Sequence, residues 1–159
     1  MITVVHVGRK QPEDDLVMEM SALLCERKKV VLVVHEELLQ NWLRQLQRFR
    51  VPCARGDVRS NWEKGRIAIQ IGDEARAGEL AIELQASVLM FVTRVMGFLN
   101  ESCHPFAVLS ATGAEEAMAS GLIDGRMALM VRAGQAALRS GVQKVSFGRS
   151  PLRPFSRLL

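Results

Sequence analysis

Continuous apolar runs alternate along this chain with segments in which apolar residues recur every three or four positions. The runs cover Ile2–Val7, Val30–Val34, Arg66–Ile71, Ser87–Thr93 and Gln143–Phe147, with a shorter one at Val51–Ala54. A strand with one face in water alternates apolar and polar residues, so continuous runs indicate strands buried on both faces. Their order along the chain predicts an α/β fold, a three-layer α-β-α sandwich with a mainly parallel sheet.

The segments between the runs predict amphipathic helices. One helix opens at Glu13, and the others span Glu36–Arg50, Asp73–Gln85, a short stretch before Gly121, and Arg126–Ser140. The polar segment between residues 55 and 65 predicts a loop. The expected inward faces carry Leu16, Met20, Leu23, Leu24, Leu39, Trp42, Leu43, Leu46, Ala77, Leu80, Ala81, Leu84, Met127, Met130, Val131, Ala137 and Leu138.

Local signals mark the ends of the last two helices. Either Ser110 or Thr112 caps the shorter helix, and Thr112-x-x-Glu115 has the spacing of a capping box. Gly121 and Gly141 stand where a glycine commonly ends a helix.

Composition indicates one globular domain. Of the 159 residues, 48% are apolar and 24% are charged, with only 5 prolines, which suits a single core. We assign residues 1–148 to this domain and residues 149–159 to a basic C-terminal tail. No apolar run reaches the ~18 residues of a membrane helix and the N-terminus lacks a signal pattern, so we expect a cytoplasmic protein without a membrane span.

The tail is the one place where charge is concentrated. The net charge is +4, and the tail holds Arg149, Arg153 and Arg157 without an acidic residue. Such a segment can bind nucleic acid or an acidic partner. The chain has no tyrosine and no recognised nucleic-acid motif, which favours docking on a protein surface.

Cysteines and histidines form no metal-ligand pattern. Cys25, Cys53 and Cys103 are odd in number and widely spaced, which favours reduced thiols over a disulfide framework. The adjacent pair Cys103-His104 is not a usual ligand spacing. We therefore expect no metal site and no bound cofactor.

Two long segments carry a further pattern: VLMFVTRVMGFLN from Val88, and SATGAEEAMASGLIDGRMALMVRAGQAALRSGVQKV from Ser110. They resemble the strand-and-turn L-L-T-D-V-x-G-V-L and the helical segment T-A-x-E-A-x-x-L-I-x-x-G-x-I-x-G-G-M-x-x-K-V of the amino-acid kinase family, nearest to acetylglutamate kinases. Nearer the N-terminus, ITVVHVGRK, VLVVHEEL and KGRIAIQIG are similar to the family's V-V-K-x-G-G-S, V-L-V-H-G-G-G and G-x-I-P-V-I-x-x-I-G. The resemblance implies a shortened, truncated form of that family's fold.

The resemblance also implies where phosphoryl-transfer groups would stand. Transfer from ATP to a carboxylate depends on lysines and glycine-rich backbone amides that neutralise charge. The first lysine position is His6 in this chain, and Gly8-Arg9 replaces the following Gly-Gly. The phosphate-cradling glycines correspond to Glu36-Glu37-Leu38, which introduces two carboxylates.

Three further positions depart from the family pattern. The helical lysine corresponds to Met130, the aspartate of T-D-V to Arg94, and the N-A-D motif to Gly72-Asp73-Glu74. Loss of one charge-stabilising donor typically costs about 3–4 kcal/mol of barrier. The combined departures predict little phosphoryl transfer.

Three cations remain as candidates for ligand binding. Lys10 stands two residues beyond Gly8, where it can substitute for the first lysine, and Arg94 and Arg126 can bind an anion in a remodelled site. The alternative for the two arginines is a solvated surface position.

Two functions from different classes follow. We favour a catalytically inactive, pseudokinase-like protein that serves as an interaction, scaffold or regulatory subunit, with a protein partner or a homo-oligomer and without a nucleotide. This interpretation rests on the glycines of the family's scaffold, which are present here although the family's phosphoryl-transfer residues are not. These glycines are Gly97, Gly121, Gly125 and Gly141. The alternative is a residual acetylglutamate or amino-acid kinase, or a small-molecule or nucleotide binder. A third possibility is nucleic-acid binding through the tail.

Overall fold

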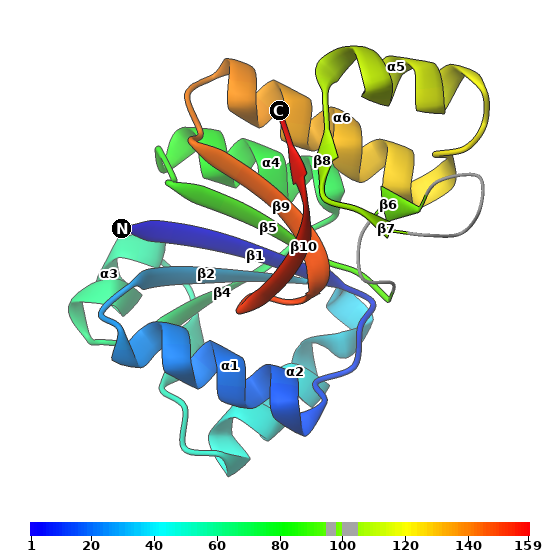
Figure 1. The fold of residues 1–159 in the computed structure, drawn as a ribbon. Coiled ribbons are helices and arrows are strands. Elements are labelled where there is room, and N and C mark those ends of the chain that lie inside the picture. Colours follow the sequence, from blue (N-terminus) through cyan, green and yellow to red (C-terminus); the bar gives the residue numbers. More distant parts are fainter. Residues whose placement is uncertain (95–97, 100–104) are drawn as a thin grey trace.

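The computed structural model describes residues 1–94, 98–99 and 105–159, so Gly97, Cys103 and His104 lie outside the described residues. Its main sheet has eight strands in the order β3-β4-β2-β1-β5-β9-β10-β8 (Figure 1). These strands are β1 (Ile2–Gly8), β2 (Lys29–Val34), β3 (Cys53–Arg55), β4 (Ile67–Ile71), β5 (Val88–Val92), β8 (Val108–Leu109), β9 (Lys144–Ser150) and β10 (Arg153–Leu158). A separate antiparallel pair is formed by β6 (Phe98–Leu99) and β7 (Pro105–Phe106).

The sheet is mainly parallel, as the continuous apolar runs predict. Strands β3, β4, β2, β1, β5 and β9 run in one direction, each parallel to its neighbour. Among the described strands of the main sheet, the one antiparallel pairing joins β9 to β10, and β10 pairs in parallel with β8.

Helices cover both faces of this sheet (Figure 1). One face carries α1 (Asp14–Cys25) and α2 (Leu39–Arg48), and the other carries α4 (Glu74–Glu83), α5 (Ala111–Ala119) and α6 (Gly125–Arg139). Successive strand residues point to opposite faces, so Val5 packs in a core with α1 and α2 while Val4 packs in a core with α4 and α6. The predicted three-layer α-β-α sandwich is confirmed.

The helical spacing also identifies the inward faces correctly. Every residue predicted to point inward is buried or half-buried, with Trp42 and Val131 fully enclosed. No helix within the described residues is long and apolar enough to cross a bilayer.

The polar stretch between residues 55 and 65, predicted as a loop, contains the short helix α3 (Val58–Glu63). Its N-terminus is capped by the Asp57 side chain, which accepts from the backbone N–H of Ser60 at 2.9 Å. The indole N–H of Trp62 donates to the Val30 carbonyl of β2 at 3.1 Å. The sequence misses this helix because polar caps and tertiary hydrogen bonds, rather than an apolar period, define it.

The basic segment 149–159, predicted as a tail, contributes β10 to the main sheet. Leu158 is 1% exposed and packs in the core beneath α6. Arg149 and Arg157 are exposed, whereas Arg153 begins the strand. The sequence does not predict this strand, because arginines and prolines outnumber the apolar residues that point into the core.

Helix ends follow the predicted signals with small differences. Ser110 caps α5 by accepting from the backbone N–H of Gly113 at 3.0 Å, so Ser110 rather than Thr112 is the cap. Gly121 and Gly141 both have positive φ, which glycine adopts without steric cost. The predicted helix from Glu36 begins instead with a 3-10 turn, η1 (Glu36–Leu38), before α2.

Candidate functional site

A crevice opens at the carboxyl ends of β1 and β5. These strands are neighbours in the sheet, yet the chain leaves β1 toward α1 on one face and leaves β5 toward α5 and α6 on the other (Figure 1). Ligands of open α/β sheets bind at such a topological switch point, because the diverging connections leave space between them.

A cavity of about 430 Å³ lies at this point, within the size range of small-molecule sites. We call it the switch-point cavity. Its lining residues come from the ends of β1 and β5, from the loop after β1, and from the N-terminal turns of α4 and α6: His6, Val7, Gly8, Arg9, Lys10, Glu74, Val92, Thr93, Arg94, Arg126, Met127 and Met130.

Among the described residues that line the cavity, His6 is the one ionisable residue that is fully buried, with 1% of its surface exposed. Its Nδ1 atom has no hydrogen-bond partner among the described residues. Burial lowers the pKa of His6; the carboxylates of Glu74 and Asp73 raise it, and the guanidinium of Arg126 lowers it. A neutral imidazole with an unused nitrogen can exchange a hydrogen bond with a ligand, but it cannot supply the fixed positive charge of a lysine.

Gly8 ends β1 with φ of +55°, and a Cβ atom there would lie 3.0 Å from His6 Cε1. Glycine therefore serves two needs, the left-handed backbone and the close approach of the His6 ring. The Gly8 carbonyl accepts from the backbone N–H of His35 at 2.9 Å, which ties the end of β1 to the loop after β2.

Lys10 and Arg9 reach the cavity from the loop after β1. The Lys10 carbonyl accepts from the indole N–H of Trp42 at 2.9 Å, and Lys10 Nζ lies 3.7 Å from a Glu13 carboxylate oxygen. Arg9 pairs with Glu37 at 3.6 Å. Trp42 thus fixes the loop, while each cation is partly compensated by a carboxylate outside the cavity.

Two helices direct their N-termini toward the switch-point cavity. Glu74 stands in the first turn of α4, behind the capping Asp73, which accepts from the backbone N–H of Arg76 at 2.9 Å. Arg126 and Met127 stand in the first turn of α6. Unpaired N–H groups and the helix dipole make such ends favourable for anions. With Arg9, Lys10, Arg94 and Arg126 against Glu74, the lining has a net positive character.

The residues singled out from the sequence largely meet here. His6, Gly8, Arg9, Lys10, Glu74, Arg94, Arg126 and Met130 all line the cavity. Glu36 and Glu37 lie on η1 and are not part of the lining, although Glu37 reaches it through its pair with Arg9. Arg149 and Arg157 also lie outside the lining. The sequence misses Thr93 and the apolar walls Val7, Val92 and Met127, which are recognisable only as neighbours of the candidates.

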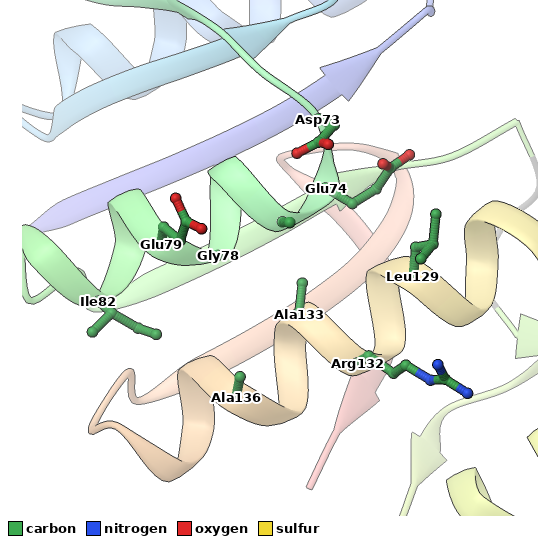
Figure 2. Close-up of a pocket in the computed structure, with 10 residues that line it drawn as sticks. Asp73, Glu74, Gly78, Glu79, Ile82, Leu129, Arg132, Ala133 and Ala136 are labelled. Atoms are coloured by element: carbon green, nitrogen blue, oxygen red, sulfur yellow. The ribbon is translucent and has the colours of Figure 1, made fainter.

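A second cavity of about 360 Å³ lies between α4 and α6. Figure 2 shows Gly78 of α4 facing Ala133 of α6, with Glu74 near one end of the groove and Ile82 near the other. A Cβ atom on Gly78 would lie 3.2 Å from the Ala133 Cβ atom, so small residues allow the close helix approach. The walls are mostly apolar, and Leu129 on the rim is 52% exposed.

Among the described residues, no group of three or more histidine, cysteine or acidic side chains is placed to hold a metal ion. Cys25 and Cys53 are free thiols. Burial raises the pKa of the Cys53 thiol, an effect that the Arg66 guanidinium opposes, so Cys53 is a structural rather than an activated thiol.

With the fold and the cavity established, comparison with known proteins identifies the class. The model of the amino acid kinase family matches residues 7–148, and this chain belongs to that family. A search of curated protein sequences gives no significant match.

Solved structures with similar folds include three informative relatives. The chain is similar to smu.665 from Streptococcus mutans UA159, with a TM-score of 0.85 and 14% identity over 99% of this chain and 98% of that one. It is similar to N-acetylglutamate synthase from Neisseria gonorrhoeae complexed with coenzyme A and N-acetyl-glutamate, with a TM-score of 0.76 and 14% identity over 99% of this chain and 59% of that one. It is also similar to carbamate kinase from Giardia lamblia bound to AMP-PNP, with a TM-score of 0.77 and 10% identity over 99% and 98%. At these identities the likeness establishes the fold alone.

Proposed function

We propose that this chain is a non-catalytic member of the amino acid kinase family that binds a small anionic molecule in the switch-point cavity and acts as a regulatory or scaffold subunit. The observation that carries the proposal is the charge of the cavity lining: Lys10, Arg94 and Arg126 converge with two helix N-termini above an uncharged, buried His6.

The first part of the proposal is ligand binding. Guanidinium groups bind carboxylates and phosphates through paired N–H donors, and helix N-termini add to the attraction. His6 lines the same cavity, and its Nδ1 atom has no hydrogen-bond partner among the described residues. The apolar walls formed by Val92, Met127 and Met130 suit a ligand that also carries hydrocarbon.

The second part is the absence of phosphoryl transfer. Moving a phosphoryl group requires fixed cations and backbone amides around the transferring oxygens. Here a fully buried histidine of lowered pKa stands at one cationic position and Met130 at another. Glu74 on the lining adds negative charge close to where phosphate oxygens would gather.

The third part is a role in an assembly. The α4–α6 groove (Figure 2) offers mostly apolar walls beside the half-exposed Leu129, and Glu74 lines both the groove and the switch-point cavity. A ligand that repositions Glu74 would therefore alter the surface of the groove, which is how a binding site regulates a contact.

The test combines titration, an activity assay and solution mass. Inorganic phosphate, acetylglutamate, ADP and Mg-ATP are titrated calorimetrically into the purified chain. We expect at least one anion to bind saturably and Arg94→Ala/Arg126→Ala to weaken it by about tenfold or more. Arg132→Ala is the matched control, because Arg132 lies on α6 but lines the groove instead. Silence with every anion removes the binding proposal, and ADP formation from Mg-ATP with acetylglutamate removes the non-catalytic one.

A residual amino-acid kinase is the second candidate, favoured by one observation. Lys10 lines the same cavity from the loop after β1, and the Trp42 hydrogen bond to its carbonyl holds it there. If Lys10 performs the role of the missing lysine, Lys10→Met abolishes a measurable phosphoryl transfer and Trp42→Phe reduces it. Absence of transfer in the unaltered chain decides against this candidate.

A further inference from the structure

We propose that a second site, at the opposite edge of the sheet, binds a small carboxylate with a short apolar chain. A cavity of about 130 Å³ lies where the strands β1, β5 and β9 begin. We call it the amino-edge cavity. It is lined by Met1, Thr3, Leu23, Lys28, Val88, Met90, Lys144, Ser146, Pro151, Leu152 and Pro154.

The hydroxyl of Ser146 is the first observation that points to a ligand. Ser146 is 0% exposed, and its Oγ atom has no hydrogen-bond partner among the described residues. It stands opposite Met90 of β5 in the parallel register. A buried hydroxyl without a partner is costly, so such groups commonly meet an ordered water or a ligand. Thr3, also buried, brings a second hydroxyl to the same cavity.

Two lysine side chains bring positive charge to the amino-edge cavity. Lys28 reaches it from the turn after α1 and Lys144 from the first residue of β9. Lys28 Nζ is paired with Glu26 at 2.7 Å, whereas Lys144 of the lining has no carboxylate partner among the described residues. Arg157 is the cross-strand partner of Ser146 in β10 and so shares its face of the sheet. None of the described residues that line the cavity is acidic. The occupant is therefore an anion.

The walls and the volume narrow the class of anion. Much of the lining is apolar, through Leu23, Val88, Met90, Pro151, Leu152 and Pro154. At ~30 Å³ for each water molecule, the space holds about four waters, or an ion of about five non-hydrogen atoms. A carboxylate of two to four carbons meets both conditions, with its oxygens at Ser146 and Lys144 and its carbon chain against the apolar wall.

The test uses propionate on the full chain labelled with ¹⁵N. We expect saturable shifts of the backbone amides of Lys144, Ser146 and Met90, and a rise in melting temperature with propionate concentration. Propionamide has the same shape without the charge and produces neither effect. Inorganic phosphate tests whether charge alone is sufficient for binding. If phosphate shifts the same amides as strongly as propionate does, the site accepts any small oxyanion, and the assignment to carboxylates is overturned.

Two serine variants separate a ligand site from a structural defect. Ser146→Ala weakens propionate binding by about tenfold, the factor expected for one hydrogen bond to a charged group. Without propionate, Ser146→Ala melts no lower than the unaltered chain, because its hydroxyl has no partner to lose. Ser156→Ala is the matched control: Ser156 is 1% exposed and stands opposite Phe147, on the other sheet face. It lowers the melting temperature and leaves binding unchanged.

Lys144→Met keeps the aliphatic stem and removes the charge, and we expect it to weaken propionate several-fold. The proposal is overturned if propionate does not shift the amide resonances of Lys144, Ser146 and Met90, because the cavity then holds only water. It is also overturned if the shifts persist unchanged in Ser146→Ala, which assigns them to unspecific binding. Neither result bears on the switch-point cavity, because none of its lining residues is shared.

Discussion

His6 meets Phe91 edge to face, with ring centroids 5.5 Å apart and an angle of 62° between the ring planes. Phe91 stacks in turn on Phe147, with centroids 5.3 Å apart. The three rings come from β1, β5 and β9, which are adjacent in the sheet. A titratable ring therefore closes one end of an aromatic stack, at the floor of the switch-point cavity.

The first prediction concerns the pH dependence of folding stability. Burial lowers the pKa of native His6, so below about pH 6.5 the unfolded chain binds a proton that the native state binds less readily. His6 therefore makes stability fall as the pH drops below about 6.5, by up to about 1.4 kcal/mol per pH unit, until native His6 is itself protonated. Urea unfolding at about pH 7.5 and 5.5 measures the effect against His6→Gln, which lacks it.

Glu74 provides the complementary variant. Its carboxylate favours the charged imidazole and raises the pKa of His6, so Glu74→Gln lowers that pKa further and widens the pH range over which stability is lost. His35→Gln replaces a histidine outside the aromatic stack and serves as the matched control. Equal pH dependence in the unaltered chain and in His6→Gln would contradict the assignment.

The second prediction concerns the C-terminal strand. Leu158 is 1% exposed within the core, whereas Leu159 next to it is 55% exposed. We expect Leu158→Ala to lower the free energy of unfolding by about 2–5 kcal/mol, and Leu159→Ala to change it by less than about 0.5 kcal/mol. Denaturant titration of the two variants distinguishes an integral strand from a loose tail, for which both changes would be small.

How far the sequence predicts this fold depends on the kind of signal. The long parallel strands and α1, α2, α4 and α6 are encoded by apolar runs and helical periods, which are local and repeated. The helix α3 and the strand β10 are not. Asp57 and Trp62 fix α3 through hydrogen bonds. The sequence of β10 predicts a basic tail instead of a strand, because prolines and arginines interrupt its apolar residues.

The switch-point cavity was accessible to prediction for a different reason. His6 and Gly8 lie in the last three residues of β1, and Lys10 and Arg94 lie two residues beyond the ends of β1 and β5. Parallel strands bring their carboxyl ends to one edge. The amino-edge cavity could not be predicted in the same way. The amino-edge cavity forms because the β9–β10 hairpin encloses Ser146, and no local sequence pattern predicts this hairpin. Its only sequence signal is a serine within the apolar run before Phe147.

The third prediction separates the two caps that sequence alone leaves open for α5. Ser110 accepts from the backbone N–H of Gly113 at 3.0 Å, whereas Thr112 lies within the helix and is exposed. Ser110→Ala should lower the free energy of unfolding by about 1 kcal/mol, the usual value of an N-cap. Thr112→Ala should leave it unchanged or raise it slightly, because alanine favours helix. Urea unfolding decides, and the reverse order of the two variants would make Thr112 the cap.

The fourth prediction sets intrinsic helix propensity against packing. Gly134 lies inside α6, where alanine is favoured over glycine by about 1 kcal/mol in an exposed helix. A Cβ atom at Gly134 would, however, lie 2.8 Å from Val145 Cγ1 and 3.0 Å from Leu158 Cδ2. Both neighbours are enclosed in the core, so the helix or the strands must shift, at a typical cost of about 1–3 kcal/mol.

Packing should therefore exceed propensity, and we expect Gly134→Ala to lower the free energy of unfolding. The double variant Gly134→Ala/Leu158→Ala removes one of the two clashing side chains and should be less destabilised than the sum of the single variants, because the two sites share a contact. Strict additivity, or a stabilising Gly134→Ala, would mean that α6 does not press against β9 and β10 as described. If the double variant is less destabilised than the sum, β10 and α6 are energetically coupled. The first turn of α6 lines the switch-point cavity, so this coupling connects the C-terminal strand to that cavity.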